Sequence, residues 1–253
     1  MLLDDREICA TFSFMSLSPL YSFLVYLEHK KSITKDELAE FGEKSSRGII
    51  GKMEAMGFIS RKEAGGQALI SLSKKGYDFL NSVLDAIHKN IEHWDGRWRI
   101  ISFSIPEKNR FRRDKFRRFL EAKGLKMIVS GVWATPFDLK EKIYAEANKL
   151  DILDRIVIFE TDKILGISQE AMISAWNFVK YRKMFEDFIQ KSDEFLQSGD
   201  QDENRCEVKR LIFEYALILN NEPKVPIELV PKDWPKFRAN MNYRKLKNLL
   251  SKS

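Results

Sequence analysis

The stretch 44–72, KSSRGIIGKMEAMGFISRKEAGGQALISL, predicts a helix that is followed at once by a β-hairpin. The apolar residues of its first half repeat at helical spacing and share one side of the helix: Ile49, Ile50, Met53 and Met56. Gly57 is expected to end this helix, because glycine readily adopts the left-handed conformation that follows many helices. Two runs of strand-forming residues then enclose Gly65-Gly66, a pair that favours a tight turn between strands. The apolar side of the helix should therefore pack into a core beside the hairpin.

Two more helices are expected before this stretch. Residues 16–29 carry a capping serine, a proline in the first turn and apolar residues at helical spacing. A second helix should begin at Ser32 or Thr34 and end at Gly42. Helix, helix, tight turn, helix and hairpin is the order of a winged helix-turn-helix. Residues 73–91 then resume a helical pattern that carries the chain away from the hairpin.

The other side of the helix within 44–72 combines small residues with cations. Cations neutralise DNA phosphates, and small side chains let a helix lie close to a groove. We predict that Arg47 contacts a base edge, and that Ser45 and Ser46 either cap the helix or bond to phosphate. The predicted DNA-binding residues lie on this helix and on the first hairpin strand: Lys44, Ser45, Ser46, Arg47, Lys52, Arg61 and Lys62. For each of them, an ordinary solvated surface residue is the alternative.

A second pattern begins at Trp94-Asp95-Gly96-Arg97-Trp98, two tryptophans expected to pack a domain junction. Residues 99–105 alternate as a strand does, and Pro106 stops them. The elements expected next are a helix over 109–123, strands over 125–129 and 132–134, a helix over 139–150 and a strand over 156–159. This β-α-β-β-α-β order is ferredoxin-like. From about Ser168 onward the pattern is helical again.

The fold class is therefore α+β, and a chain of 253 residues has room for two or three small domains. We expect an N-terminal winged helix-turn-helix domain with its linker helix, a ferredoxin-like βαββαβ middle domain and a C-terminal helical domain. The expected boundaries are 1–92, 93–166 and 167–253.

The composition predicts a globular protein without a membrane anchor. Hydrophobic residues make up 44% and charged residues 32%, a mixture that builds packed cores and leaves a charged surface. The apolar stretches are too short to span a bilayer and the N-terminus lacks a basic signal-peptide start, so we expect a cytoplasmic protein. Cys9 and Cys206 lie far apart, and the three histidines share no spacing with a nucleophile or carboxylate. We predict no metal site, no cofactor and no catalytic residue, and hence no enzyme.

The densest positive charge of the sequence lies in and just before the helix over 109–123. Its cations are Lys108, Arg110, Arg112, Arg113, Lys115, Arg117 and Arg118. Apolar residues gather on one face of this helix, and Asp114 and Glu121 stand at helical spacing from arginines with which they can pair. A solvated amphipathic helix is therefore preferred here to a second nucleic-acid surface. The net charge of +6 is compatible with a polyanionic partner but does not identify one.

Aromatic residues recur in the C-terminal part of the sequence. Trp176, Tyr181, Phe185 and Trp234 are candidates for lining an effector cavity. A stripe of aromatic residues at helical spacing is more often part of a core, and that interpretation is preferred.

Two segments resemble the PaaX family of phenylacetate-degradation repressors: 94–108, WDGRWRIISFSIPEK, and 225–235, VPIELVPKDWP. The similarity keeps the same domain order over most of the chain. It implies a DNA-binding head, a ferredoxin-like middle domain used in dimerisation and a C-terminal helical domain. The founding members of the family respond to an aryl-acyl-coenzyme A. No effector-binding residues carry over to this sequence, so the effector site is unknown.

The middle domain also resembles the small ferredoxin-like nuclease of CRISPR adaptation. The likeness lies in residues 100–106, in the basic helix after them and in Val129-Ser130-Gly131-Val132-Trp133. It implies an alternative function, a metal-dependent nuclease or a scaffold like that of CRISPR adaptation. In that family the first strand ends with an aspartate proposed to hold a divalent metal, and the matching residue here is Ser104. A neutral hydroxyl cannot replace a carboxylate as a ligand of a hard cation, which argues against cleavage.

We accordingly expect a homodimeric, sequence-specific transcriptional regulator that acts as a repressor. Its partner would be an operator of double-stranded DNA, with the third helices of the two heads in successive major grooves. A small-molecule effector of the acyl-coenzyme A type would release it from DNA. A regulator without ligand sensing, acting as a constitutive DNA-binding protein, is a further alternative.

Overall fold

The computed structural model describes residues 19–34, 37–38, 43–88, 93–198 and 204–251. By their internal contacts they form two compact units, each with its own antiparallel sheet. The first unit takes residues 1–89, 181–222 and 235–253, and the second takes 90–180 and 223–234. The expected α+β class with a helical C-terminal part is confirmed.

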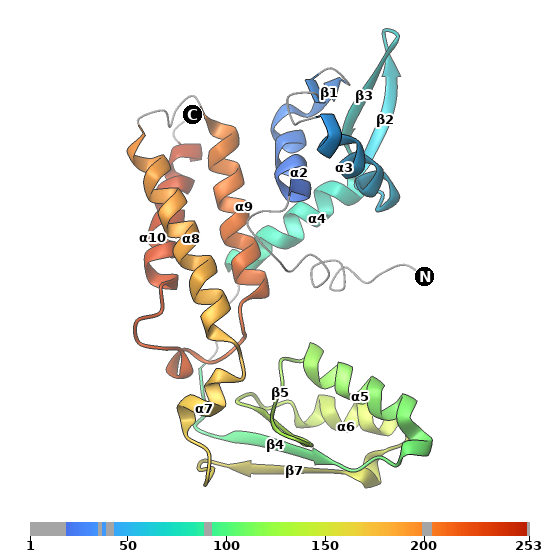
Figure 1. Ribbon diagram of the computed structural model, residues 1–253, viewed down its shortest axis with the longest axis vertical. Coiled ribbons are helices and arrows are strands. Elements are labelled where there is room, and N and C mark those ends of the chain that lie inside the picture. Colours follow the sequence, from blue (N-terminus) through green and yellow to red (C-terminus); the bar gives the residue numbers. More distant parts are fainter. Residues whose placement is uncertain (1–18, 35–36, 39–42, 89–92, 199–203, 252–253) are drawn as a thin grey trace. The chain divides into compact units, whose positions relative to one another are not determined.

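The first unit begins with helices around a three-stranded sheet (Figure 1), and we call residues 19–88 the head. Its elements are α2 (Pro19–Lys30), β1 (Ser32–Thr34), α3 (Glu43–Ala55), β2 (Ile59–Ala64), β3 (Gln67–Leu72), α4 (Lys74–Leu84) and η2 (Asp85–His88). The strands lie in the order β1-β3-β2. The expected helix over 16–29 is observed as α2, the helices within and after 44–72 are observed as α3 and α4, and the hairpin is present. The helix expected from Ser32 or Thr34 to Gly42 lies largely outside the described residues and stays a prediction.

The sequence missed strand β1, in which Ser32 lies. Ile33 of this strand is fully buried and stands opposite Ile70 of β3. Of the two caps considered, Thr34 is the one observed: its Oγ1 accepts a hydrogen bond from the Glu37 N–H at 3.3 Å. The Glu37 carboxylate in turn accepts from the Thr34 N–H at 2.8 Å, which completes a capping box. The end of the predicted helix at Gly42 lies outside the described residues.

The C-terminal helices of the first unit include one that shares the core of the head. These helices are α8 (Phe178–Gln197), which lies in this unit from residue 181 onward, α9 (Arg205–Asn221) and α10 (Lys236–Ser251). Helix α9 packs against α2 and α4 (Figure 1), and the rings of Tyr21 and Phe213 lie 5.9 Å apart. Lys209 Nζ lies 2.6 Å from Glu28 Oε2. One hydrophobic core thus joins the head to α9, while the three-domain division by residue number stays a prediction.

The second unit has the β-α-β-β-α-β order expected from the sequence. Its elements are β4 (Trp98–Phe103), η3 (Glu107–Asn109), α5 (Arg110–Ala122), β5 (Lys126–Val129), β6 (Val132–Thr135), α6 (Lys140–Lys149), η4 (Leu153–Arg155), β7 (Ile156–Thr161), α7 (Gln169–Ser174) and η5 (Ile227–Leu229). The strands lie in the order β5-β6-β4-β7 and every neighbouring pair is antiparallel. The ferredoxin-like order of elements is therefore confirmed.

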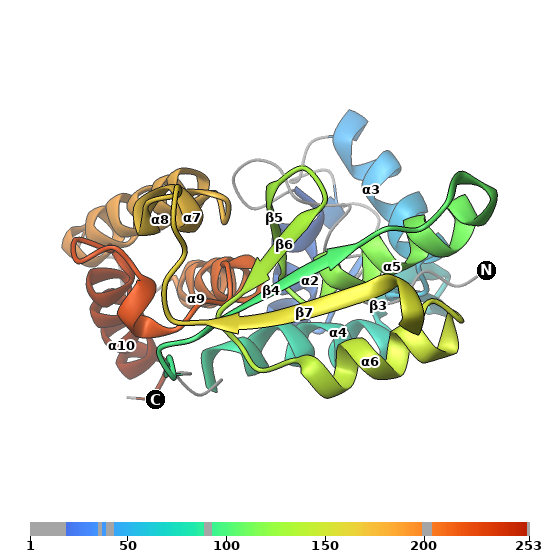
Figure 2. The ribbon, with the colours of Figure 1, turned by 90° about the horizontal axis from the view of Figure 1, so that it is seen from below.

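The two faces of this sheet differ. Helices α5 and α6 cover one face, where Ile101 packs into a core with Phe116 and Ile143. Alternate residues of a strand point to opposite faces, so the partners Ile100 and Phe159 point away from the helices. Figure 2 shows this second face in front of α5 and α6, and we call it the open sheet face. Its exposed apolar side chains are Val129, Val157 and Phe159, which are 49%, 52% and 55% exposed.

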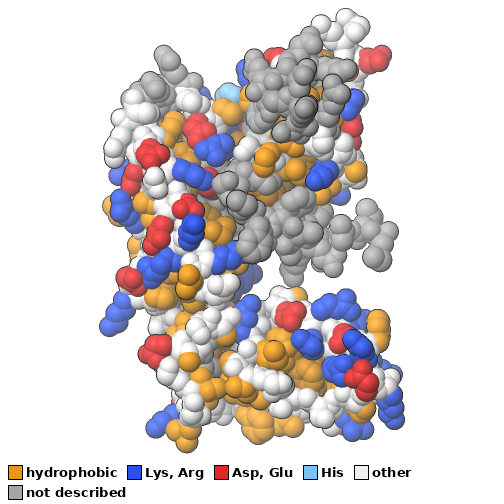
Figure 3. Space-filling view, viewed as in Figure 1, with side chains coloured by type: hydrophobic (Ala, Val, Ile, Leu, Met, Phe, Trp, Pro, Cys, Tyr) orange, Lys and Arg blue, Asp and Glu red, His pale blue; other side chains and the backbone are white. Residues whose placement is uncertain are grey.

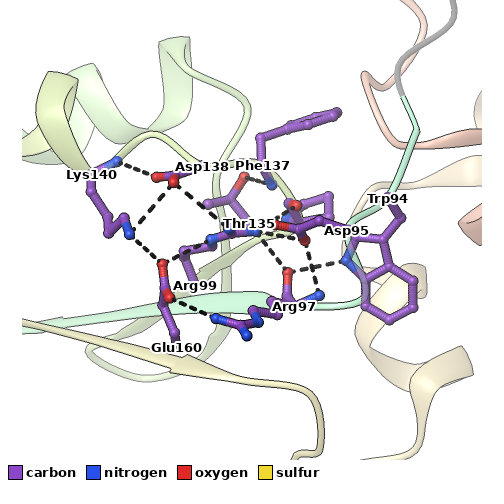
Figure 4. Close-up of polar contacts among 10 residues, drawn as sticks. Trp94, Asp95, Arg97, Arg99, Thr135, Phe137, Asp138, Lys140 and Glu160 are labelled. Atoms are coloured by element: carbon purple, nitrogen blue, oxygen red, sulfur yellow. Dashed lines mark hydrogen bonds and ion pairs between the residues drawn. The ribbon is translucent and has the colours of Figure 1, made fainter.

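An ion cluster fixes the segment before β4 (Figure 4). The Arg99 side chain is 4% exposed and lies against Asp95, with Nη1–Oδ1 2.9 Å and Nη2–Oδ2 2.5 Å. Its Nε lies 3.4 Å from Glu160 Oε1, which also pairs with Lys140 Nζ at 2.7 Å. Asp138 lies 3.5 Å from Lys140 Nζ and 3.8 Å from Arg99. Each carboxylate of the cluster therefore has a cation beside it. The hydrogen bonds from Arg99 lower the pKa of Asp95.

The two segments that carry the PaaX resemblance meet in the second unit. Glu228 Oε2 accepts a hydrogen bond from the Trp94 N–H at 3.0 Å, and its Oε1 lies 2.8 Å from His93 Nδ1. The ring of Trp98 lies 5.5 Å from that of Trp94 and 6.0 Å from that of Trp176. These tryptophans therefore pack the start of β4, in agreement with the structural role predicted for Trp94 and Trp98.

Candidate nucleic-acid interface

Helix α3 buries the side that its sequence predicts. Ile49, Ile50 and Met53 are at most 7% exposed and belong to the core of the head. The helix ends where glycine permits a left-handed residue: Gly57 has φ +72°, its N–H bonds to Glu54 O at 2.8 Å, and the Phe58 N–H bonds to Met53 O at 2.9 Å. These two bonds form a Schellman motif, which directs the chain from α3 into β2.

The opposite side of α3 is exposed and carries little bulk. Its described residues are Gly48, Gly51, Lys52 and Ala55. A Cβ atom built on Gly48 or Gly51 would have no neighbour within 4 Å. We call this side the open side of α3. It offers backbone and one cation to an approaching molecule, as a helix in a groove requires.

Most of the predicted contact residues of α3 fall where side chains are outside the described part of the structure. Helix α3 includes positions 44–47, so Lys44, Ser45, Ser46 and Arg47 lie in its first two turns. Lys52 is exposed on the open side. The structure therefore places these residues on one helix, and their contacts with DNA stay a prediction.

The two predicted contact residues of β2 lie on opposite faces of a tight β-hairpin. Gly65 and Gly66 have φ +61° and +77° between the paired residues Ala64 and Gln67, which makes a two-residue turn of the type that suits a twisted hairpin. Arg61 and Lys62 are neighbours in β2, so their side chains point to opposite faces. Both are exposed, but they do not share one surface.

Arg61 is tied to α3 by a contact that the sequence did not predict. Its guanidinium pairs with Glu54, with Nη2 3.1 Å from Oε2, and both side chains are exposed. Because Glu54 is near the end of α3 and Arg61 is near the start of β2, the pair bridges the bend at Gly57. The positive charge of Arg61 is thus partly compensated, whereas Lys62 has no ion-pair partner within the described residues.

A close contact at Gly76 positions the hairpin against α4, and the sequence did not predict this contact either. A Cβ atom at this position would lie 2.2 Å from the carbonyl oxygen of Phe58. Ser73 caps α4 by accepting from the Gly76 N–H at 3.0 Å, and its hydroxyl donates to Gly57 O at 2.6 Å. Only glycine fits here, so α4 holds the start of β2, and with it the end of α3, in place.

The residues relevant to metal binding lie in the second unit. Ser104 follows β4, is exposed, and donates its backbone N–H to Arg155 O at 3.0 Å. The carboxylates of Asp95, Asp138 and Glu160 come together, but each is beside a cation. Among the residues that the structure describes, no group of three or more His, Cys, Asp or Glu side chains could hold a metal ion.

The aromatic candidates for an effector cavity are divided between the two units. Trp176 and Trp234 belong to the second unit and are 2% and 4% exposed. Phe185 is fully buried in the first unit, and its ring lies 6.5 Å from that of Tyr215. Tyr181 is half-buried there, and burial raises the pKa of its phenol. Three of the four side chains are therefore buried as parts of the hydrophobic cores.

Within the described ranges, no helix is both long enough and apolar enough to cross a membrane.

Comparison with known proteins gives two family matches and a structural neighbour. Residues 91–173 match the model of the PaaX protein central Cas2-like domain, and residues 176–253 match that of the PaaX-like protein C-terminal domain. No curated protein matches. Among solved structures, an uncharacterised protein, Rv0674 from Mycobacterium tuberculosis, is similar at 18% sequence identity with a TM-score of 0.53, over 94% of this chain and 97% of that one. At this identity the likeness concerns the fold alone.

Proposed function

Because this chain belongs to the PaaX-like family of regulators, we propose that it is a sequence-specific DNA-binding transcriptional repressor of the cytoplasm. The proposal makes residues 1–92 a winged helix-turn-helix, with α3 in the major groove and the β2–β3 hairpin as the wing. The observation that carries it is the open side of α3, where glycines leave space for a groove. Helix α3 is followed directly by a hairpin with a tight glycine turn.

The contact residues have distinct roles in the proposal. Arg47 contacts a base edge, and Lys44, Ser45 and Ser46 hold the phosphates near the start of α3. Lys52 on the open side and Lys62 on the wing neutralise further phosphates. Arg61 reaches DNA by giving up its pair with Glu54, a small cost because exposed ion pairs contribute about 0–1 kcal/mol.

The proposed repressor is a homodimer held together by residues 93–166. The open sheet face supports this assignment, because Val129, Val157 and Phe159 expose apolar surface that α5 and α6 do not cover. Interfaces between identical subunits have cores that are more apolar than the remaining surface. A two-fold axis through this face would pair two identical heads with an inverted repeat in the operator.

In this proposal, an effector of the acyl-coenzyme A type releases the repressor from DNA. Family membership alone supports it, and no cavity residue is assigned. The effector would lower operator affinity by favouring a second arrangement of the heads. The step fails if no acyl-coenzyme A thioester changes the operator affinity or the melting temperature of the protein.

Selection of bound fragments from random duplex DNA tests the main proposal. The wild-type protein should enrich an inverted repeat, and Arg47→Ala should lose this enrichment. Lys74→Ala, which removes an exposed lysine at the start of α4, is the matched control and should keep it.

A parallel incubation with Mg²⁺ or Mn²⁺ tests the nuclease alternative. Metal-dependent cutting that survives Arg47→Ala would move the function to the second unit and overturn the proposal. The serine at position 104 and the paired carboxylates predict uncut DNA.

A further inference from the structure

Positive charge is distributed very unevenly along the chain. The head, residues 19–88, has ten lysines and arginines against nine aspartates and glutamates, a net charge of +1. Residues 107–123, which form η3, α5 and the residue after it, have eight lysines and arginines against three acidic residues, a net charge of +5. Phosphate neutralisation supplies a large share of DNA affinity, so a nearly neutral head contributes little to this electrostatic part of the affinity.

Three of the five arginines of α5 are engaged in ion pairs. Arg113 pairs with Glu107 at 2.7 Å, and Arg112 pairs with Asp151 at 2.9 Å. Arg110 lies 3.6 Å from Asp114 and 3.8 Å from Glu107. This part of the helix is the solvated, ion-paired surface that the sequence predicts.

A second line of residues, which begins in η3 and continues along α5, carries cations without ion-pair partners among the described residues. Lys108 lies in η3, directly before α5, and Phe111, Lys115 and Arg118 follow at spacings of three, four and three, which places the last three along one side of α5. Among the described residues, none of the three cations has a carboxylate within ion-pair distance; Arg118 Nε donates only to the carbonyl oxygen of Asp114, at 3.3 Å. Phe111 between them is 72% exposed. We call this line the basic stripe of α5.

The basic stripe faces away from the sheet of its own unit. Phe116 and Leu120 form the buried side of α5 and are fully buried in the core against the sheet. The open sheet face is on the other side of the sheet, so a dimer formed there leaves the stripe accessible. Figure 3 shows lysine and arginine side chains gathered over this part of the second unit.

We propose that the basic stripe of α5 is a second duplex-binding surface, which contacts the DNA phosphates independently of the bases. From Phe111 to Arg118 the stripe extends over about 10 Å of α-helix, at a rise of about 1.5 Å per residue, and Lys108 lies in η3 before it. Phosphates of one DNA strand follow one another every ~3.4 Å along the axis, so Lys108, Lys115 and Arg118 can each meet a different phosphate. The proposal goes beyond sequence recognition by the head: it makes the second unit a source of affinity without specificity.

The salt dependence of binding to a random-sequence DNA duplex tests this inference. Lys115→Gln combined with Arg118→Gln should reduce the slope of log affinity against log salt by about 2, since each phosphate contact contributes ~0.9. The wild-type protein would then lose about tenfold more affinity than the variant between about 50 and 200 mM salt. The control is Arg110→Gln with Arg112→Gln, which removes the same charge from paired positions of the same helix and should change the slope by less than half as much.

The outcomes separate this inference from the proposed function. A slope that is unchanged in the stripe variant, or reduced equally in both variants, overturns the inference even if an operator is found. A stripe effect seen only with an RNA duplex also overturns it. Because random DNA is used, a reduced slope supports the stripe whether or not the head proves to be sequence-specific. On an operator, the stripe variant should weaken all sequences by the same factor and leave the ranking of sites unchanged.

Discussion

The open side of α3 leads to a prediction in which protein stability and DNA affinity move in opposite directions. Gly51 lies in the helix interior, is exposed, and has empty space around its missing Cβ. Glycine inside a helix costs about 0.5–1 kcal/mol relative to a good helix former. Gly51→Leu should therefore raise the free energy of unfolding by about that amount and the melting temperature by about 1–4 °C.

The same leucine would stand where the proposal places the DNA groove. Its side chain would hold the helix backbone away from the base edges, so operator affinity should fall at least about tenfold, or about 1.4 kcal/mol. Thermal unfolding followed by circular dichroism measures the first effect, and fluorescence anisotropy with a labelled operator measures the second. Ala145→Leu places a leucine on an exposed position of α6 in the second unit and is the matched control.

A variant that is more stable yet binds DNA as well as the wild type would refute this reasoning. That result would mean that the open side of α3 faces solvent in the complex. A loss of binding together with a loss of stability would also count against it, because the free space around Gly51 predicts no strain.

Three further predictions follow from the packing and the ion pairs. Gly76→Ala should lower the free energy of unfolding by about 1–3 kcal/mol in chemical denaturation, because its Cβ would meet the carbonyl oxygen of Phe58; unchanged stability would contradict the close packing. Phe159→Lys on the open sheet face should convert the proposed dimer into a monomer in light scattering, whereas a dimer of unchanged affinity would place the interface elsewhere. Because Arg99 lowers the pKa of Asp95, this carboxylate stabilises the fold above about pH 4 and loses its contribution as pH falls through the lowered value. Asp95→Asn should therefore flatten the fall of melting temperature in acid, and parallel curves for the two proteins would show that the pair contributes nothing.

The sequence predicted the second unit well because its elements are encoded locally. Alternating apolar residues mark β4 and β7, and the basic helix has a clear apolar face. The three-residue strand β1 was missed, because such a run is too short to show a period, and its pairing with β3 is a contact between distant residues. The sequence predicts helical structure for the region of α9 but not that Phe213 enters the core of the head.

The candidate site was only partly predictable for the same reason. The helical period identified the exposed and buried sides of α3, which the structure confirms at Ile49, Ile50 and Met53. The pair between Glu54 and Arg61 was not predicted, because it depends on the bend at Gly57 that brings two elements together. Strand alternation alone predicts that Arg61 and Lys62 point to opposite faces.

The central claim is that α3 recognises a DNA sequence, and the ratio of two affinities tests it most directly. Titration of one protein preparation with the selected operator and with a scrambled duplex of the same length gives this ratio at a single salt concentration. We predict a preference of about 10³ or more for the operator, and a much smaller one for Arg47→Ala. A ratio near one, unchanged by Arg47→Ala, would contradict it.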